Sequence, residues 1–301
     1  MLAPAPPDSS ERAGFLGSFQ RTLEMIRFAH SVFALPFALL ALVVALGGWP
    51  AWPLLGWVLL AMVAARSAAM GVNRIADRRF DAQNPRTAGR HLVTGSLGVP
   101  FALVFTLVCV ALFFLAAARI NHLALLLSPV VLVVLLGYSF LKRFTSLAHL
   151  GVGLALGLAP LGAWVAARGT LEGPLAFPLL LGAAVVFWVA GFDVIYACQD
   201  VEVDRRLGLY SIPARLGIPA ALRAAAAFHL LCLALFASAA LPGGLLRAYP
   251  VAWALSVVLL WRAHRLARHA GIGPANAALM PLNGLVAVLL GAAGILDVLL
   301  P

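Results

Sequence analysis

The sequence carries little charge, and most of the charge that it does carry is positive. Charged residues make up 11% of its 301 residues, and only 11 of those residues are aspartate or glutamate. A soluble domain carries roughly a quarter charged residues. Apolar residues make up 63% of the chain and stand in long runs of Leu, Ala, Val and Phe. This composition excludes an ordinary soluble domain and predicts a chain whose main solvent is lipid.

Cysteines are few, and the basic residues do not form one continuous patch. The three cysteines, Cys109, Cys198 and Cys232, lie in apolar surroundings without metal-ligand or redox spacing, so we expect packing residues. The net charge of +10 is spread over short basic clusters between apolar runs. That distribution excludes a nucleic-acid-binding patch and is typical of the loops that orient membrane proteins.

Nine apolar runs have about the length of a membrane span. A transmembrane helix needs about 20 mostly apolar residues. The runs cover residues 28–48, 53–72, 98–118, 121–141, 147–167, 174–194, 221–241, 245–262 and 277–299. The eighth is the weakest, because it is short and includes Arg247. We therefore expect an all-α integral membrane protein with about nine transmembrane helices, built as a single domain over residues 21–301.

The basic residues predict the orientation of these spans. Nearly all of the 21 lysines and arginines fall in the N-terminal segment or in the loops after the even-numbered spans. The exceptions are Arg66, Arg119, Arg168 and Arg247. The positive-inside rule then places the N-terminus in the cytoplasm and the C-terminus outside. Residues 1–20 lack an apolar core, so we expect a mobile cytoplasmic tail and no signal peptide.

Acidic residues gather in two short stretches at the cytoplasmic ends of the second and sixth spans. Residues four apart share one face of a helix, and so do residues three apart. By this spacing the polar residues form two stripes. The first stripe is Asn73, Asp77 and Asp81, and the second is Asp193, Tyr196, Asp200 and Asp204.

Two acidic stripes in a carboxylate-poor chain call for a partner of opposite charge. Like-charged side chains at this spacing are mildly destabilising. Magnesium binds one or two carboxylates and completes its shell with water and substrate phosphate, so two facing stripes could hold ions around a diphosphate. The alternative is that the acids form ordinary ion pairs with adjacent arginines. Those arginines are Arg74, Arg78, Arg79, Arg205 and Arg206.

Further basic residues are compatible with phosphate binding. Arg86 and Arg90 follow the first stripe, and Lys142 and Arg143 end the fourth span. Their position fits ordinary positive-inside charge equally well. Arg66 differs, because it lies two turns inside the second span, where a charge is usually functional or paired. Three histidines stand alone in apolar spans and predict packing or hydrogen-bonded residues: His30, His149 and His229.

These motifs resemble those of the UbiA superfamily of intramembrane prenyltransferases. The first stripe matches its Asn-x-x-x-Asp-x-x-x-Asp motif, and residues 193–204 match Asp-x-x-Tyr-Ala-x-Gln-Asp-x-x-x-Asp without a gap. Residues 86–90 resemble its Arg-Thr-x-x-Arg segment, and residues 138–145 its Tyr-x-x-x-Lys-Arg-x-Thr segment. The resemblance covers about residues 21–217. It departs at residues 92–95, where Leu-Val-Thr-Gly replaces Leu-Pro-x-Gly, and we expect a changed loop there.

The resemblance implies a fold and a reaction. The fold is nine helices around a central cavity, with the two motifs facing each other at its cytoplasmic mouth. The reaction is transfer of a polyprenyl group from its diphosphate to an aromatic acceptor. The closest resemblance is to the 4-hydroxybenzoate branch, which includes prenylating enzymes of the futalosine route to menaquinone. This implies quinone biosynthesis in a bacterial inner (plasma) membrane, with the active site on the cytoplasmic side.

The resemblance also implies residue roles. Mg²⁺ would be held by Asn73, Asp77, Asp81, Asp200 and Asp204. The diphosphate would be bound by Arg74, Lys142 and Arg143. Tyr196 would face the allylic cation, and Asp193 would orient or deprotonate the phenol or serve as another metal ligand. Arg27 would bind the acceptor's carboxylate or be an interfacial charge.

Three other functions compete with this one. An ion-coupled transporter would place acids near the bilayer midplane, and here the acids other than Asp297 lie at helix ends or in loops. A structural membrane protein would not need two acidic stripes on one membrane face. The third competing function is that of another enzyme of the same family, which acts on haem or on a different quinone precursor.

Overall fold

Helices are the only regular elements in the part of the chain that the structure describes. The structure, a computed structural model, describes residues 15–26 and 33–300. In chain order the helices are α1 (Phe15–Met25), α2 (Leu35–Leu46), α3 (Trp52–Asp81), α4 (His91–Thr94), α5 (Val99–Ile120), α6 (His122–Leu141), α7 (Ala148–Arg168), α8 (Ala176–Ala197), a 3₁₀ turn (Cys198–Asp200), α9 (Val201–Arg206), α10 (Ile212–Leu216), α11 (Ile218–Gly243), α12 (Ala248–His269) and α13 (Ile272–Leu299).

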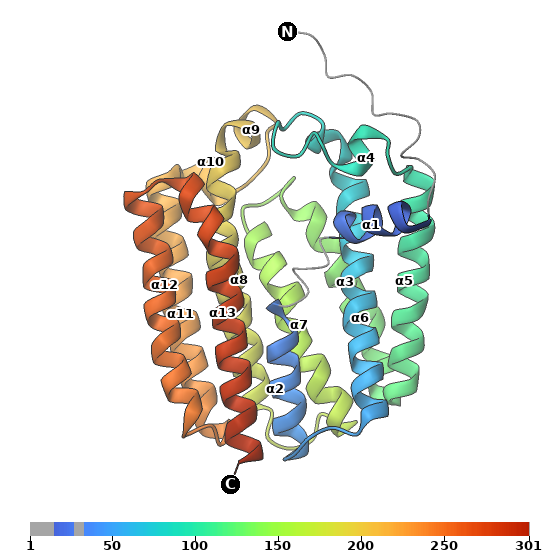
Figure 1. Ribbon diagram of the computed structural model, residues 1–301, viewed down its shortest axis with the longest axis vertical. Coiled ribbons are helices and arrows are strands. Elements are labelled where there is room, and N and C mark those ends of the chain that lie inside the picture. Colours follow the sequence, from blue (N-terminus) through green and yellow to red (C-terminus); the bar gives the residue numbers. More distant parts are fainter. Residues whose placement is uncertain (1–14, 27–32, 301) are drawn as a thin grey trace.

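The long helices form an up-and-down bundle. Figure 1 shows them side by side, with the short helices α4, α9 and α10 gathered at one end and the C-terminus at the other. We call the end of the bundle that carries α4, α9 and α10 the α9 end. Helix α1 lies across the bundle near the same end. The loops that follow α3, α6 and α8 therefore all emerge at the α9 end.

Seven helices within the described ranges are long and apolar enough to cross a membrane: α3, α5, α6, α7, α8 with its continuation to Arg206, α11 and α13. This confirms an all-helical membrane protein. The expected nine spans and the orientation stay predictions. Helix α2 has 12 residues, a length of about 18 Å, which is short of the roughly 30 Å hydrocarbon core. Helix α12 is longer, but arginines interrupt its second half.

Several expected boundaries move. The first run, 28–48, contains a helix over Leu35–Leu46, and residues 27–32 lie outside the described ranges. Pro36 suits the first turn of that helix, and Gly47 ends it in a left-handed conformation with φ of 64°. The eighth run shifts to Ala248–His269, and the ninth begins earlier, at Ile272. The expected tail over 1–20 overlaps α1, which begins at Phe15.

Helix α2 is short but lies in the core. Phe37 is fully buried and contacts Trp188 of α8, with ring centroids 5.4 Å apart. It also stacks on Phe236 of α11 at 5.3 Å. Aromatic pairs of this kind add about 0.5–1.5 kcal/mol beyond the area that they bury. The three rings hold α2, α8 and α11 together in the middle of the bundle.

Asp297, the acid inside the last span, has a structural role. Its carboxylate accepts hydrogen bonds from the backbone N–H groups of Arg247, Ala248 and Tyr249 at 2.6–3.2 Å. These are the first amide groups of α12, which no carbonyl within that helix can satisfy. Asp297 therefore caps α12 from α13, and the transporter hypothesis loses its one intramembrane acid.

Helices α7 and α8 approach each other closely because glycines lie at their contact. A Cβ on Gly153 would collide with the backbone oxygen of Val186, and one on Gly157 would overlap Gly182. Small residues let helix backbones approach in membranes. The contact also sets the relative height of the two helices at the α9 end. There His149, one turn before Gly153, lies beside Asp193, two turns after Val186.

We expect Gly153→Ala to destabilise the protein by about 1–3 kcal/mol, because the new methyl group has no space against a backbone carbonyl. Gly162→Ala on the same helix is the matched control, since a Cβ there meets nothing within 4 Å. Alanine is also the better helix former. Thermal unfolding in detergent measures both variants. Equal midpoints for the two would contradict the close contact.

Candidate active site

The first acidic stripe lies on one continuous helix, as expected. Helix α3 runs for 30 residues and carries Asn73, Asp77 and Asp81 near its end. Asp77 and Asp81 are buried, with relative exposures of 2% and 7%. Buried carboxylates need partners, because desolvation of an isolated charge is costly.

The second stripe is not carried by one continuous helix. Helix α8 ends at Ala197, a 3₁₀ turn follows, and α9 begins at Val201. A 3₁₀ turn has 3.0 residues per turn in place of 3.6, which rotates the residues that follow it. The expected stripe from 193 to 204 therefore runs over the end of α8, the 3₁₀ turn and α9.

Side chains from α3 and from the end of α6 contact the carboxylate of Asp77. Asn73 Nδ2 donates to Asp77 Oδ2 at 3.2 Å and to Ser139 Oγ at 3.3 Å. Lys142 Nζ donates to the same Asp77 oxygen at 2.6 Å, and Arg143 Nη2 lies 3.9 Å from Oδ1. Asp77 Oδ1 is buried and accepts no hydrogen bond. An orphaned carboxylate oxygen of this kind is a free ligand position for a cation.

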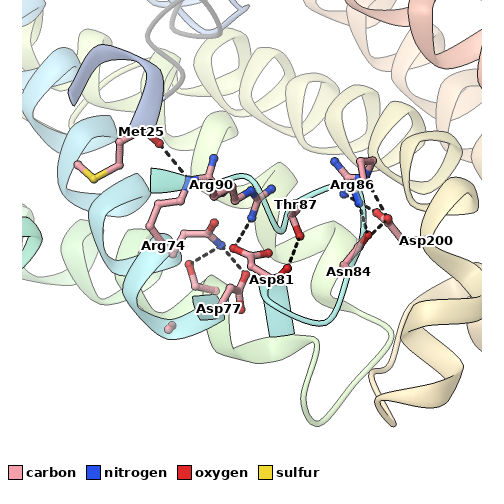
Figure 2. Close-up of polar contacts among 12 residues, drawn as sticks. Met25, Arg74, Asp77, Asp81, Asn84, Arg86, Thr87, Arg90 and Asp200 are labelled. Carbon is pink, nitrogen blue, oxygen red and sulfur yellow. Dashed lines mark hydrogen bonds and ion pairs between the residues drawn. The ribbon is translucent and has the colours of Figure 1, made fainter. Parts of the chain in front are cut away.

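The loop between α3 and α4 reaches both acidic stripes (Figure 2). On one side Arg90 Nη1 donates to Asp81 Oδ2 at 2.5 Å, and Thr87 Oγ1 donates to the Asp81 carbonyl at 3.1 Å. On the other side Asn84 Nδ2 donates to Asp200 Oδ1 at 2.9 Å. One loop thereby fixes the distance between α3 and the end of α8.

Arg86, also in this loop, contacts both oxygens of Asp200 and the hydroxyl group of Tyr196. Its Nε and Nη2 donate to the two oxygens of Asp200 at 3.0 and 2.6 Å, the paired geometry favoured by guanidinium and carboxylate. Its Nη1 donates to the Tyr196 hydroxyl at 3.0 Å, and its Cζ lies 5.2 Å from the centre of that ring. Burial alone would lower the pKa of Arg86, but the hydrogen bonds and charge of Asp200 raise it above its usual value.

Two remaining aspartates have neutral partners. Ser211 Oγ donates to Asp204 Oδ2 at 2.7 Å. His149 Nδ1 lies 2.7 Å from Asp193 Oδ2, and the Ile212 backbone N–H donates to His149 Nε2 at 3.2 Å. The sequence predicted a packing or hydrogen-bonded role for His149. The hydrogen bond is present, and it is made to a candidate catalytic residue.

Arg74, which was predicted to bind the diphosphate, has its described contact with the end of α1. Arg74 is buried, and its Nε donates to the Met25 carbonyl at 3.0 Å, which ties α3 to the end of α1 (Figure 2). Arg27 lies outside the described residues. The sequence also predicted no role for Asn84, which stands two residues before the Arg-Thr-x-x-Arg segment.

The ion-pair alternative was right about pairing and wrong about the partners. Asp77, Asp81 and Asp200 pair with Lys142, Arg90 and Arg86, which the sequence analysis had grouped as phosphate-compatible. Four of the five adjacent arginines donate to backbone carbonyls: Arg74 to Met25, Arg78 to Leu92, Arg205 to Ala214 and Arg206 to Gln83. Within residues 15–26 and 33–300, no three His, Cys, Asp or Glu side chains stand close enough to hold a metal ion. The magnesium ligands therefore stay a prediction.

An apolar cavity lies inside the bundle beside this cluster. It measures about 560 Å³ and is bounded by α2, α3, α5, α6, α7 and α8. Arg66 and Tyr138 are among its few polar lining residues. Tyr138 directly precedes Ser139, which contacts Asn73, so the cavity wall continues into the acidic cluster. The other lining side chains are mostly Leu, Val and Ala.

The fold and the site define an integral membrane helical bundle that places paired acids and bases next to an apolar cavity. The model of the UbiA prenyltransferase family matches residues 34–293. The chain therefore belongs to the UbiA prenyltransferase family, which confirms the resemblance of its motifs.

Individual relatives agree with this assignment. The 4-hydroxybenzoate octaprenyltransferase of Paracidovorax citrulli is 35% identical over 235 residues, which is 76% of each chain. The protein of the same name from Albidiferax ferrireducens is 37% identical over 177 residues, and the match spans 59% of each chain. These names support the expected enzyme class, a polyprenyltransferase of the 4-hydroxybenzoate type.

Solved structures show the same fold. A UbiA homologue from Aeropyrum pernix K1 in its apo form has a TM-score of 0.81 and 37% identity, covering 90% of this chain and 98% of that one. A UbiA homologue from Archaeoglobus fulgidus, bound to GPP and Mg²⁺, has a TM-score of 0.72 and 22% identity, covering 92% and 99%.

We expect Asp77 and Lys142 to depend on each other for stability. Lys142→Met leaves a buried carboxylate without its cation, at a cost of about 1–3 kcal/mol, discounted because Lys142 is 32% exposed. The double variant Asp77→Asn with Lys142→Met should recover most of that loss. Thermal unfolding in EDTA tests the cycle. Strictly additive single effects would show that the pair is not coupled.

Proposed function

We propose that this protein transfers a polyprenyl group from a polyprenyl diphosphate to 4-hydroxybenzoate or a related hydroxy-aromatic acid in quinone biosynthesis, with Mg²⁺ as cofactor. The observation that carries the proposal is the apolar cavity beside the acid–base cluster. An isoprenoid tail requires an apolar space of this kind, and a diphosphate requires several cations and hard oxygen ligands. The names of the relatives support the acceptor class.

The cations of the cluster would bind the diphosphate. Lys142 and Arg143 reach the site from the end of α6, and Arg86 and Arg90 from the α3–α4 loop. In this structure Lys142, Arg86 and Arg90 each neutralise one aspartate. Phosphate oxygens would take over these donors as the diphosphate arrives. Arg74 is a further candidate for binding the diphosphate.

The aspartates fit a hard divalent cation. The candidate ligands are all oxygen donors, as magnesium prefers, and the buried Asp77 Oδ1 accepts no hydrogen bond. Asn73, Asp77 and Asp81 would hold magnesium from α3, and Asp200 and Asp204 from the end of α8 and from α9. Bound there, magnesium would act as a Lewis acid that makes diphosphate a better leaving group.

In the reaction, the bond between the allylic carbon and the diphosphate oxygen breaks, and a bond forms between that carbon and a ring carbon ortho to the hydroxyl. The ring proton and the diphosphate are released. Tyr196 would face the developing allylic cation, since its ring already lies under a guanidinium. Asp193 would orient or deprotonate the phenol. The apolar cavity keeps water from the cation.

The location of the site follows from the charge pattern. Lys142, Arg143, Arg86 and Arg90 all belong to loops at the α9 end. By the positive-inside rule we place the α9 end, with the active site, at the cytoplasmic face of a bacterial inner membrane. Arg27 would supply the contact to the acceptor's carboxylate from the chain segment before α2.

Purified protein in detergent, incubated with magnesium and a polyprenyl diphosphate, should prenylate 4-hydroxybenzoate. Parallel reactions contain 1,4-dihydroxy-6-naphthoate, and EDTA should abolish product in each case. Product from the naphthoate alone would place the enzyme in menaquinone synthesis by the futalosine route. Ion flux in vesicles without any prenylated product would instead support a transporter.

We expect Asp77→Ala and Asp200→Ala each to lower prenyl transfer by about 100-fold or more. Each substitution removes a proposed ligand of the magnesium ion that would stabilise negative charge on the departing diphosphate. Glu202→Ala is the matched control, since that acid is 90% exposed on α9. All three variants should still insert into the membrane. Full activity of both aspartate variants would refute the metal-binding role.

A further inference from the structure

Three chain segments meet at His149. The residue lies in the first turn of α7 and is buried, with 4% of its surface exposed. Its Nδ1 faces Asp193 Oδ2 of α8 at 2.7 Å, and its Nε2 accepts the Ile212 backbone N–H of α10 at 3.2 Å. Each ring nitrogen thus has one partner. A histidine held at both nitrogens has little freedom to rotate.

The two contacts fix the tautomer of His149. A backbone amide can only donate, so Nε2 must carry a lone pair and no proton. The ring proton of the neutral imidazole is therefore on Nδ1, and it is donated to Asp193. The arrangement matches the general pattern in which the partner of one ring nitrogen sets the role of the other.

The contact with His149 leaves one oxygen of Asp193 for other partners. Oδ2 accepts the histidine proton, and no residue in the described part of the chain donates to Oδ1. The Asp193 side chain is 30% exposed, so a small molecule can reach it. A carboxylate held through one oxygen presents the other in a defined direction.

The same turn of chain contacts a second aspartate. Ser211 donates its hydroxyl to Asp204, and the next residue, Ile212, donates its N–H to His149. The turn before α10 thereby joins the candidate metal-binding end of the site to Asp193. The contact between His149 and Asp193 depends on the close packing of α7 on α8 at Gly153, which places the two residues opposite each other.

We propose that His149 is a positioning residue for the aromatic acceptor: it orients Asp193 so that Asp193 Oδ1 receives the acceptor's hydroxyl group. The proposal rests on the function proposed above. His149 itself touches neither substrate. Its loss would misdirect Asp193, and a misplacement of about 1 Å can cost about 100-fold in rate.

Two substitutions separate this role from packing. In His149→Asn the amide nitrogen can stand where Nδ1 stands and donate to Asp193. In His149→Gln the amide oxygen can reach the place of Nε2 and accept from Ile212, while the donor to Asp193 is lost. Both remove the same ring. His269→Gln, at the exposed end of α12, is the control for a histidine change.

We expect His149→Gln to lower kcat with 4-hydroxybenzoate about 10- to 100-fold, with KM for the polyprenyl diphosphate within about twofold of wild type. His149→Asn should recover most of that loss. The double variant His149→Gln with Asp193→Asn should be no slower than Asp193→Asn alone, because His149 acts through Asp193. Thermal midpoints of the two His149 variants should be alike.

The proposal is overturned if both His149 variants lose activity in parallel with their thermal midpoints, or if His149→Gln keeps wild-type kinetics. It is also overturned if the double variant is slower than Asp193→Asn by the full His149→Gln factor. A wild-type protein that prenylates no aromatic acceptor would refute the proposed function itself, which is seen before any variant is measured.

Discussion

Opposite charges from distant parts of the chain hold the α9 end together. Asp81 and Asp200 lie on different helices, and the α3–α4 loop contacts both, through Arg90 and Arg86. The second of these pairs joins residues 114 positions apart in sequence. Without these cations the buried carboxylates would be desolvated and unpaired, a costly state in the low dielectric of a membrane protein. The position of α3 against α8 and α9 depends on this pairing.

The cavity gains its chemical character from the same cluster. Apolar side chains alone would make a space for any lipid tail. Tyr138 and Ser139 connect its wall to Asn73 and Asp77, so a long apolar ligand with an anionic head has both of its parts accommodated. Lys142, Arg86 and Arg90 balance three of the aspartates, Asp77, Asp200 and Asp81, one to one.

The sequence predicted the local patterns well and the tertiary partners poorly. Spacing by four residues placed Asn73, Asp77 and Asp81 on one helix face, because α3 continues unbroken to Asp81. After Ala197 a 3₁₀ turn interrupts the helix, and residue spacing carries no sign of it. His149 looked like an isolated histidine, since its partners Asp193 and Ile212 lie 44 and 63 positions away. For the first run, 28–48, the described residues show a helix of 12 residues, and residues 27–32 lie outside the described ranges.

The aspartates of the site fall into two kinds by their partners. Asp77, Asp81 and Asp200 each contact a full positive charge, which suits groups that exchange a cation of the protein for a metal ion. Asp193 contacts a neutral imidazole, as the Ile212 N–H requires. A neutral donor orients a carboxylate and leaves its negative charge largely in place. In the proposed mechanism Asp193 is the aspartate that faces the phenol, and His149 positions it.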